Sequence, residues 1–177
     1  MKYSTITWLM YILVISVTCR TVLGACTTGR QKRDVPVCNV FGPLSHGGHE
    51  FKFYTLKVDW QSAKDHCISE GGFLAALKDE ATTDAVTQYI EDQELGELVQ
   101  GNGFWIGLND IETEGSYLWQ DETEAQYANW APGEPNNNTK KNPDGQDCTQ
   151  MWFKRRGWKW DDDYCFKMKS FICEFTG

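Results

Sequence analysis

Residues 158–175 have the sequence WKWDDDYCFKMKSFICEF, and the elements predicted from this stretch decide the class of fold. Its two ends, 158–161 and 171–175, are short and rich in aromatic residues, which is typical of strands. Cys165, Cys173 and three consecutive aspartates lie between or within these segments. The stretch therefore predicts two strands of a cysteine-containing domain, with carboxylates at the end of the first strand.

The preceding residues predict two helices and further short strands. Residues 51–56 (FKFYTL) alternate well enough for a strand, and a helix follows with Asp59 as its N-cap and Gly71-Gly72 as its end. A second helix is predicted over 79–95, where an apolar stripe lies beside an acidic face. Two helices combined with short strands predict an α+β domain. The other strands are expected at 73–77, 104–108, 117–120 and 148–153.

The segment between Gln120 and Cys148 is long, carries no periodicity and is rich in Asn, Gly and Pro. A loop of that length in a compact domain is usually functional. Side-chain oxygens gather in this loop and in the strand that follows, and Ca2+ takes six to eight oxygen ligands. A solvated acidic surface explains the same residues equally well. The oxygen-bearing residues are Glu134, Asn136, Gln146, Asp147, Asp161, Asp162 and Asp163.

Length and charge exclude several classes of protein. With 177 residues, the chain has room for one domain and a short appendage. Its 17 Lys and Arg residues against 25 Asp and Glu give a net charge of -8, which disfavours binding to nucleic acid. Hydrophobic residues at 41% and aromatic residues at 14% are enough for a folded core.

Residues 1–24 are predicted to be a secretory signal peptide, because Lys2 precedes a mostly apolar run at 6–17 and small residues follow it. The run is shorter than the roughly 20 residues that span a bilayer, and Arg20 follows it, so no membrane span is expected. The protein is therefore predicted to be secreted and extracellular. Residues 25–37 resemble a linker, whose basic run ends at Arg33 and suits dibasic processing proteases.

Without the signal peptide, 15 basic residues face 25 acidic ones, and the mature charge becomes -10. The odd Cys19 is also removed, which leaves an even set. In an oxidising compartment an even set of cysteines indicates disulfides, although six cysteines allow 15 pairings. The remaining residues are Cys26, Cys38, Cys67, Cys148, Cys165 and Cys173.

Five short motifs resemble the signature series of C-type lectin domains in order and spacing. The resemblance covers about residues 38–177 and implies the C-type lectin-like fold, with two helices, small antiparallel sheets and a long calcium-binding loop. It also implies the disulfides Cys67–Cys173 and Cys148–Cys165; Cys26 then pairs with Cys38, or one of them bonds another chain. The motifs are Trp105-Ile106-Gly107-Leu108, Glu134-Pro135-Asn136, Asp147-Cys148, Trp160-Asp161-Asp162 before Cys165, and Phe171-Ile172-Cys173-Glu174.

The resemblance further implies a Ca2+ site that also binds sugar, and a cis peptide bond before Pro135. In sugar-binding members, the ion's ligands also hydrogen-bond two neighbouring sugar hydroxyls. The implied metal ligands are Glu134, Asn136, Gln146, Asp161 and Asp162, and all but Asp162 are the implied carbohydrate-binding residues.

Two of these ligands depart from the family pattern. Gln146 stands where Glu is usual and Asp161 where Asn is usual, so the set keeps a charge of -3. Each hydroxyl needs one acceptor and one donor, which Glu134 with Asn136 and Asp161 with Gln146 can supply. The Glu-Pro-Asn motif favours mannose, fucose, glucose or GlcNAc, and no Trp follows Asn136 to stack on galactose. In the pair Gln146 and Asp161, the carboxylate and the amide have exchanged places, which changes the order of hydrogen-bond donors and acceptors. Galactose therefore stays an alternative ligand.

A second, structural metal site is implied by the residues that resemble the family's auxiliary site, although Asn137 replaces the expected Asp. Asn137-Asn138-Thr139 is also the chain's only N-glycosylation sequon, and a glycan there would stand beside Asn136. The residues of the second metal site are Asp110, Glu114, Asn137 and Asp147.

The sequence thus predicts a secreted, calcium-dependent lectin that recognises glycans or glycoproteins, including microbial ones in innate immunity. The alternatives are a protein-, ice- or mineral-binding module on the same fold, or a galactose-binding lectin. No arrangement of nucleophile and base supports an enzyme. Without a heptad stalk, a homo-oligomer would have to use Cys26, Cys38 or a surface patch.

Overall fold

The computed structural model describes residues 39–99, 103–154 and 157–177. The signal peptide, the linker at 25–37, and Cys26 and Cys38 lie outside these ranges. The elements, in chain order, are β1 (Val40–His46), β2 (His49–Val58), α1 (Trp60–Ser69), β3 (Phe73–Leu74), α2 (Glu80–Asp92), α3 (Leu95–Leu98), β4 (Phe104–Asn109), β5 (Cys148–Lys154), β6 (Gly157–Asp163) and β7 (Lys169–Thr176).

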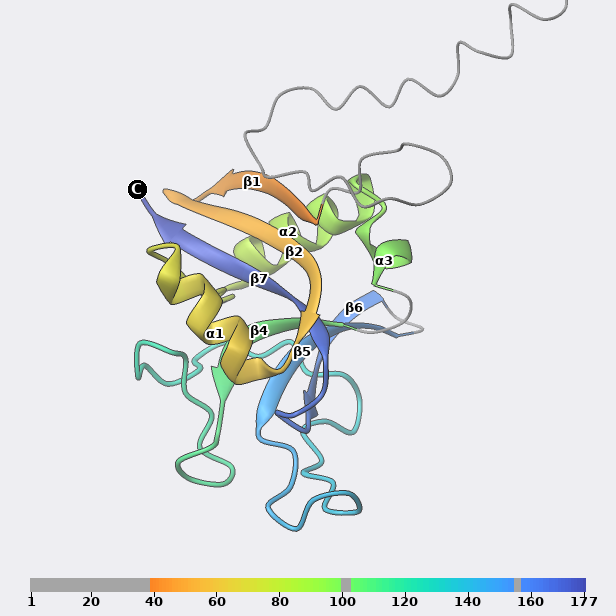
Figure 1. The fold of residues 1–177 in the computed structure, drawn as a ribbon. Helices are drawn as coiled ribbons and strands as arrows, with labels where there is room; N and C mark the ends of the chain where they lie inside the picture. Colours follow the sequence, from red (N-terminus) through yellow and green to blue (C-terminus); the bar gives the residue numbers. More distant parts are fainter. Residues whose placement is uncertain (1–38, 100–102, 155–156) are drawn as a thin grey trace, which may run out of the picture.

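The strands form one sheet in the order β1-β2-β7-β4-β5-β6, and β3 pairs with β7. All pairings are antiparallel except that of β4 with β7. In Figure 1, β1, β2 and β7 occupy one end of the molecule with α1 and α2 on either side, and long loops occupy the other end. The predicted α+β class is confirmed.

The first helix begins where its predicted N-cap places it, and the second helix also has an aspartate N-cap, at the residue where it was predicted to begin. Asp59 accepts a hydrogen bond from the backbone N–H of Ser62 (2.7 Å), and Asp79 caps α2 in the same way through Thr82. The prediction of one helix over 79–95 was too long. Glu94 takes a left-handed conformation with φ 53°, so α2 ends at Asp92 and the separate short helix α3 follows.

Two strand predictions need correction, and one strand was missed. The segment 117–120 forms only isolated bridges through Leu118, and the strand predicted at 73–77 is reduced to β3. β1 was not predicted at all. It carries Gly42 at φ 115° and a bulge between Phe41 and Leu44, and these interrupt the alternation that identifies a strand from sequence.

Trp60, Trp105, Trp119 and Trp160 belong to the core. Trp160 is fully buried, and its ring makes edge contacts with the rings of Trp119, Tyr127 and Trp130. Its backbone accepts a hydrogen bond from Ala131 (2.8 Å), which ties the long loop to β6. These side chains serve packing, and the loop that carries the candidate site is anchored on them.

The two disulfides implied by the family resemblance are present. Cys67 in α1 bonds Cys173 in β7, and Cys148 at the start of β5 bonds Cys165 after β6. The first closes 106 residues and holds a helix to the central strand; the second closes 17 residues directly beside the aspartate run.

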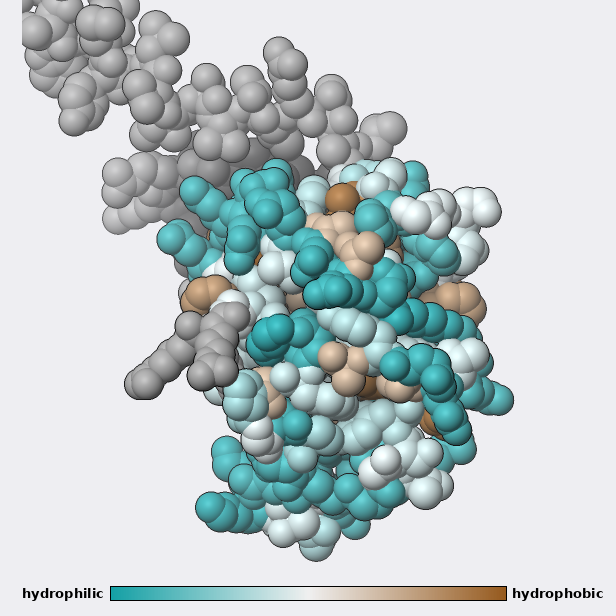
Figure 2. All heavy atoms as spheres, turned by 180° about the vertical axis from the view of Figure 1, so that it is seen from behind, coloured by the Kyte–Doolittle hydropathy of each residue, from teal (hydrophilic) through white to brown (hydrophobic). Residues whose placement is uncertain are grey.

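No helix among the described residues is long and apolar enough to cross a membrane. Seen from behind in Figure 2, the loop-bearing lower end is covered by hydrophilic and near-neutral residues. Such a surface suits a polar, hydrated ligand better than an apolar partner.

Candidate functional site

Asp162, in β6, connects the long loop to the sheet. Its side chain is fully buried, and both carboxylate oxygens accept the backbone N–H of Asn136 (3.0 and 3.1 Å). The backbone N–H of Asn137 donates to the same carboxylate at 2.6 Å. A buried carboxylate that accepts backbone N–H groups fixes the loop at this point.

Glu134 and Asn136 are held next to each other by the loop backbone. The peptide bond between Glu134 and Pro135 is cis, as predicted. The Glu134 N–H donates to the carbonyl of Ala131 (2.9 Å), and the Asn136 amide nitrogen donates to the Glu134 carboxylate. One carboxylate and one amide thus lie side by side on the solvent-facing loop.

Gln146 and Asp161 occupy the opposite side of the same cavity. The side-chain oxygen of Gln146 accepts the N–H of Asn138 (3.0 Å), and its nitrogen donates to the Asp162 carbonyl (3.0 Å) and to the Asp163 carboxylate (3.1 Å). Asp161 accepts a hydrogen bond from Gln150 (2.8 Å). All five predicted calcium ligands line one cavity of about 270 Å3.

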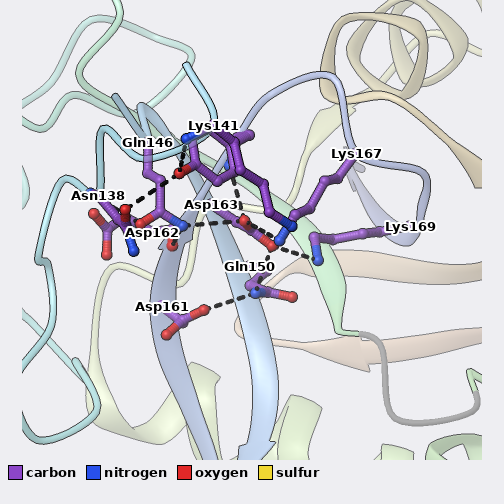
Figure 3. Close-up of polar contacts among 10 residues, drawn as sticks. Asn138, Lys141, Gln146, Gln150, Asp161, Asp162, Asp163, Lys167 and Lys169 are labelled. Atoms are coloured by element: carbon purple, nitrogen blue, oxygen red, sulfur yellow. Dashed lines mark hydrogen bonds and ion pairs between the residues drawn. The ribbon is translucent and has the colours of Figure 1, made fainter. Parts of the chain in front are cut away.

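Sequence analysis assigned no role to several residues that line this cavity. Asp163 is buried and pairs with Lys167 (2.6 Å) and Lys169 (2.8 Å), and Figure 3 shows both lysines converging on it. Burial alone would raise the pKa of Asp163, but the two ammonium groups outweigh it and lower that pKa. In the sequence, the alternation Lys167-Met168-Lys169 after Cys165 could have indicated that both lysines lie on one face of the chain. Asp163 was predicted only as one of several oxygen-bearing residues, and the lining residues without a predicted role are Asn138, Gln150, Trp152, Lys167 and Lys169.

The predicted second metal site contains a poorly compensated carboxylate. Asp110 is 3% exposed, one of its oxygens accepts the N–H of Gly115 (2.8 Å), and its carboxylate also interacts with the hydroxyl of Tyr117. Burial raises the pKa of Asp110 to about 6, and the carboxylates of Glu114 and Asp147 act in the same direction. Its backbone N–H donates to the Asp147 carbonyl (3.1 Å). Three of the four predicted residues therefore lie near one another.

Asn137, the fourth of these residues, is turned toward the 145–146 segment. It has a left-handed φ of 41°, and its side-chain oxygen accepts the N–H of Gln146 (2.8 Å). It packs so closely on Gly145 that an added Cβ there would lie 1.6 Å from that oxygen. Asn137 thus braces the loop between the two predicted metal sites, and its glycosylation remains a prediction.

The chemistry of the cavity fits a hard cation. The five predicted ligands offer carboxylate and amide oxygens, which Ca2+ prefers over nitrogen and sulfur. Within the described ranges, no three His, Cys, Asp or Glu side chains are grouped closely enough to hold a metal ion. Two of the predicted ligands are amides, so coordination requires them to act together with the three carboxylates.

Comparison with known proteins identifies the family. The sequence model described as the Lectin C-type domain matches residues 56–175. The chain belongs to the C-type lectin domain family. It is 30% identical over 167 residues to Lectin BRA-3 of Megabalanus rosa, which covers 92% of this chain and 90% of that protein.

Two further proteins illustrate the range of this C-type lectin family. The galactose-specific lectin nattectin of Thalassophryne nattereri is 29% identical over 163 residues, covering 92% of this chain and 94% of that one. The carbohydrate-recognition domain of human scavenger receptor C-type lectin is 28% identical with a TM-score of 0.63, covering 76% and 95%. The C-type lectin fold is therefore confirmed, and its members are carbohydrate-binding proteins without enzymatic activity.

Proposed function

We propose that this C-type lectin domain belongs to a secreted protein that binds mannose-type sugars through Ca2+. One observation carries the proposal: five oxygen-bearing ligands from two segments line one cavity, and Asp162 ties those segments together. Calcium, when bound, would accept two neighbouring sugar hydroxyls as ligands. The proposed ion ligands are Glu134, Asn136, Gln146, Asp161 and Asp162.

The protein's own residues would orient the sugar. Glu134 and Asn136 form one adjacent acceptor and donor for the first hydroxyl. Asp161 offers an acceptor for the second. Both N–H groups of Gln146 already donate within the protein, so donation to the sugar requires the exchange of one of those bonds. Sugar binding at the second hydroxyl is therefore expected to involve a local rearrangement at Gln146.

The proposed ligands are mannose, fucose, glucose and GlcNAc, on glycans or glycoproteins that include those of microbial surfaces. The Glu-Pro-Asn motif supports this class, and the absence of an aromatic residue directly after Asn136 disfavours galactose. The galactose specificity named for nattectin makes galactose the second candidate. A role in innate recognition and assembly into homo-oligomers are part of the same proposal.

The proposal predicts that the protein is retained on a mannose matrix in Ca2+ and released by EDTA or free mannose. Extracellular calcium modules have dissociation constants of about 0.1–1 mM, and retention should titrate in that range. A galactose matrix run in parallel tests the second candidate. Retention on mannose in excess EDTA would contradict the proposal. Failure to bind any sugar matrix in Ca2+ would favour a protein-, ice- or mineral-binding module.

We further propose that Asp110, Glu114, Asn137 and Asp147 bind a second Ca2+, and Asp110→Asn tests it. Because Asp110 is buried and the carboxylates of Glu114 and Asp147 repel its charge, removing that charge should stabilise the calcium-free protein by about 1–3 kcal/mol. The rise in melting temperature caused by Ca2+ should shrink. Glu112→Gln, at an exposed carboxylate two residues away, is the control. A calcium-free protein that is less stable, with an unchanged response to Ca2+, would contradict the second site.

A further inference from the structure

Two buried residues outside the proposed ligand set connect the two ligands that depart from the family pattern. We propose that Asp163 and Gln150 are positioning residues that hold Gln146 and Asp161 in their calcium-binding orientations. This inference rests on the proposed function, because it concerns the geometry of the same calcium and sugar site. The contacts that carry it are drawn in Figure 3.

The pairing of β5 with β6 brings these residues together. Gln150 lies directly opposite Asp161, and Cys148 lies opposite Asp163. Residues opposite each other in an antiparallel pair have side chains on the same face of the sheet, about 5 Å apart at Cβ. Gln150 and Asp161 therefore meet across the two strands, and the Cys148–Cys165 disulfide fixes the end of the pair.

Asp163 is the fixed centre of the network. One oxygen accepts from Gln146 (3.1 Å), Lys167 (2.6 Å) and the N–H of Tyr164 (2.9 Å), and the other accepts from Lys169 (2.8 Å) and Gln150 (3.3 Å). Lys169 is itself almost completely buried. Of the three consecutive aspartates, Asp163 binds both lysines, whereas Asp162 binds backbone N–H groups of the loop and Asp161 binds Gln150.

Asp163 also explains why residue 146 is a glutamine. The side-chain nitrogen of Gln146 donates to Asp163, so the side-chain oxygen of Gln146 faces Asn138 and the cavity. A glutamate in the same orientation would place a carboxylate oxygen about 3 Å from an Asp163 oxygen, and two carboxylates at that distance cannot both ionise easily. The Gln146 side chain is therefore matched to Asp163.

Gln150 performs the corresponding task for Asp161. Its nitrogen donates to Asp161 (2.8 Å) and to Asp163 (3.3 Å), so it separates two carboxylates that would otherwise repel each other. Among the residues that the structure describes, its own buried side-chain oxygen has no hydrogen-bond partner. A buried polar atom without a partner lowers stability. Gln150 lowers the stability of the fold through this oxygen, and its side chain lines the same cavity as the proposed ion ligands. Both observations indicate that Gln150 serves binding rather than folding.

The test is Gln150→Met, which keeps the volume and removes both donors. Mutations of groups that orient metal ligands typically cost 10–100-fold in affinity, and we expect Ca2+ affinity in calorimetry to fall at least about tenfold. The melting temperature in EDTA is measured alongside, because two buried carboxylates that lose a shared donor also lower stability, and affinities are compared well below that temperature. Gln88→Met is the control for affinity. That control removes a Gln–Asp hydrogen bond of 2.7 Å on the exposed surface of α2.

A second variant tests whether Gln150 acts through Asp161. In an Asp161→Ala background, Gln150→Met should reduce the remaining Ca2+ affinity by less than about twofold, because contacting residues are not additive. An undiminished tenfold loss in that background, or equal affinity of Gln150→Met and Gln88→Met, would overturn the positioning role alone. No Ca2+ binding by the unchanged protein would overturn the proposed function and this inference together.

Discussion

We expect Asp162→Ala to abolish Ca2+ and sugar binding while the disulfide-linked core stays folded. The carboxylate is a proposed ligand, and it also accepts the N–H groups of Asn136 and Asn137. Hydrogen bonds to charged groups contribute roughly 1.5–3 kcal/mol each, so the variant loses both a ligand and the anchor of the loop. The expected loss of Ca2+ affinity exceeds the roughly 100-fold upper range for residues that only orient ligands.

Calorimetric Ca2+ titration and retention on a mannose matrix measure this loss, and near-ultraviolet circular dichroism reports the core. Asp144→Ala is the matched control, because Asp144 lies on the same loop, is exposed and is not a proposed ligand. Binding by Asp162→Ala at a level close to that of Asp144→Ala would mean that the ion is held elsewhere.

The two disulfides should differ in what their removal destroys. Loop entropy predicts that Cys67–Cys173, which closes 106 residues, contributes about 5 kcal/mol, and that Cys148–Cys165, which closes 17, contributes about 3 kcal/mol. Single domains have a total stability of about 5–15 kcal/mol. The double variant Cys67→Ala/Cys173→Ala is therefore expected to be largely unfolded at 37 °C.

The variant Cys148→Ala/Cys165→Ala should remain folded but bind Ca2+ more weakly, because Cys148 pairs with Asp163 across β5 and β6. Urea unfolding gives the free energy of unfolding of each variant, and Ca2+ titration gives its affinity. If removal of the shorter disulfide reduced stability more than removal of the longer one, the entropic ranking would be wrong.

The parts of the fold that depend on local signals could be predicted from sequence. Asp59 and Asp79 cap their helices because an acidic side chain reaches a backbone N–H three residues away, which is a local contact. The disulfide pairing could be predicted only from the resemblance to C-type lectin domains, because the cysteine positions alone allow 15 pairings. The ends of α2 and the strand β1 depend on backbone conformations at Glu94 and Gly42 that no local pattern specifies.

In the candidate site, too, some features could be predicted from sequence motifs and others depend on the three-dimensional arrangement. Five of the residues that line the cavity follow from the family resemblance: Glu134 and Asn136 from Glu-Pro-Asn, Asp161 and Asp162 from Trp-Asp-Asp, and Gln146 from its place before Asp147-Cys148. The hydrogen bonds of Gln146 and Gln150 to Asp163 were not predicted, because they join residues 17 and 13 positions apart through the strand register. A glutamine that replaces a glutamate therefore has a physical cause that only the three-dimensional arrangement reveals.

The pairing of β2 with β7 also determines how the domain can be tethered. Thr176 lies opposite His49, at the end of the sheet remote from the long loops in Figure 1. A flexible linker attached to Gly177 would leave the cavity uncovered. Two domains fused tail to tail would then present their proposed sugar sites outward, and such a fusion should agglutinate glycan-coated particles that the single domain leaves dispersed.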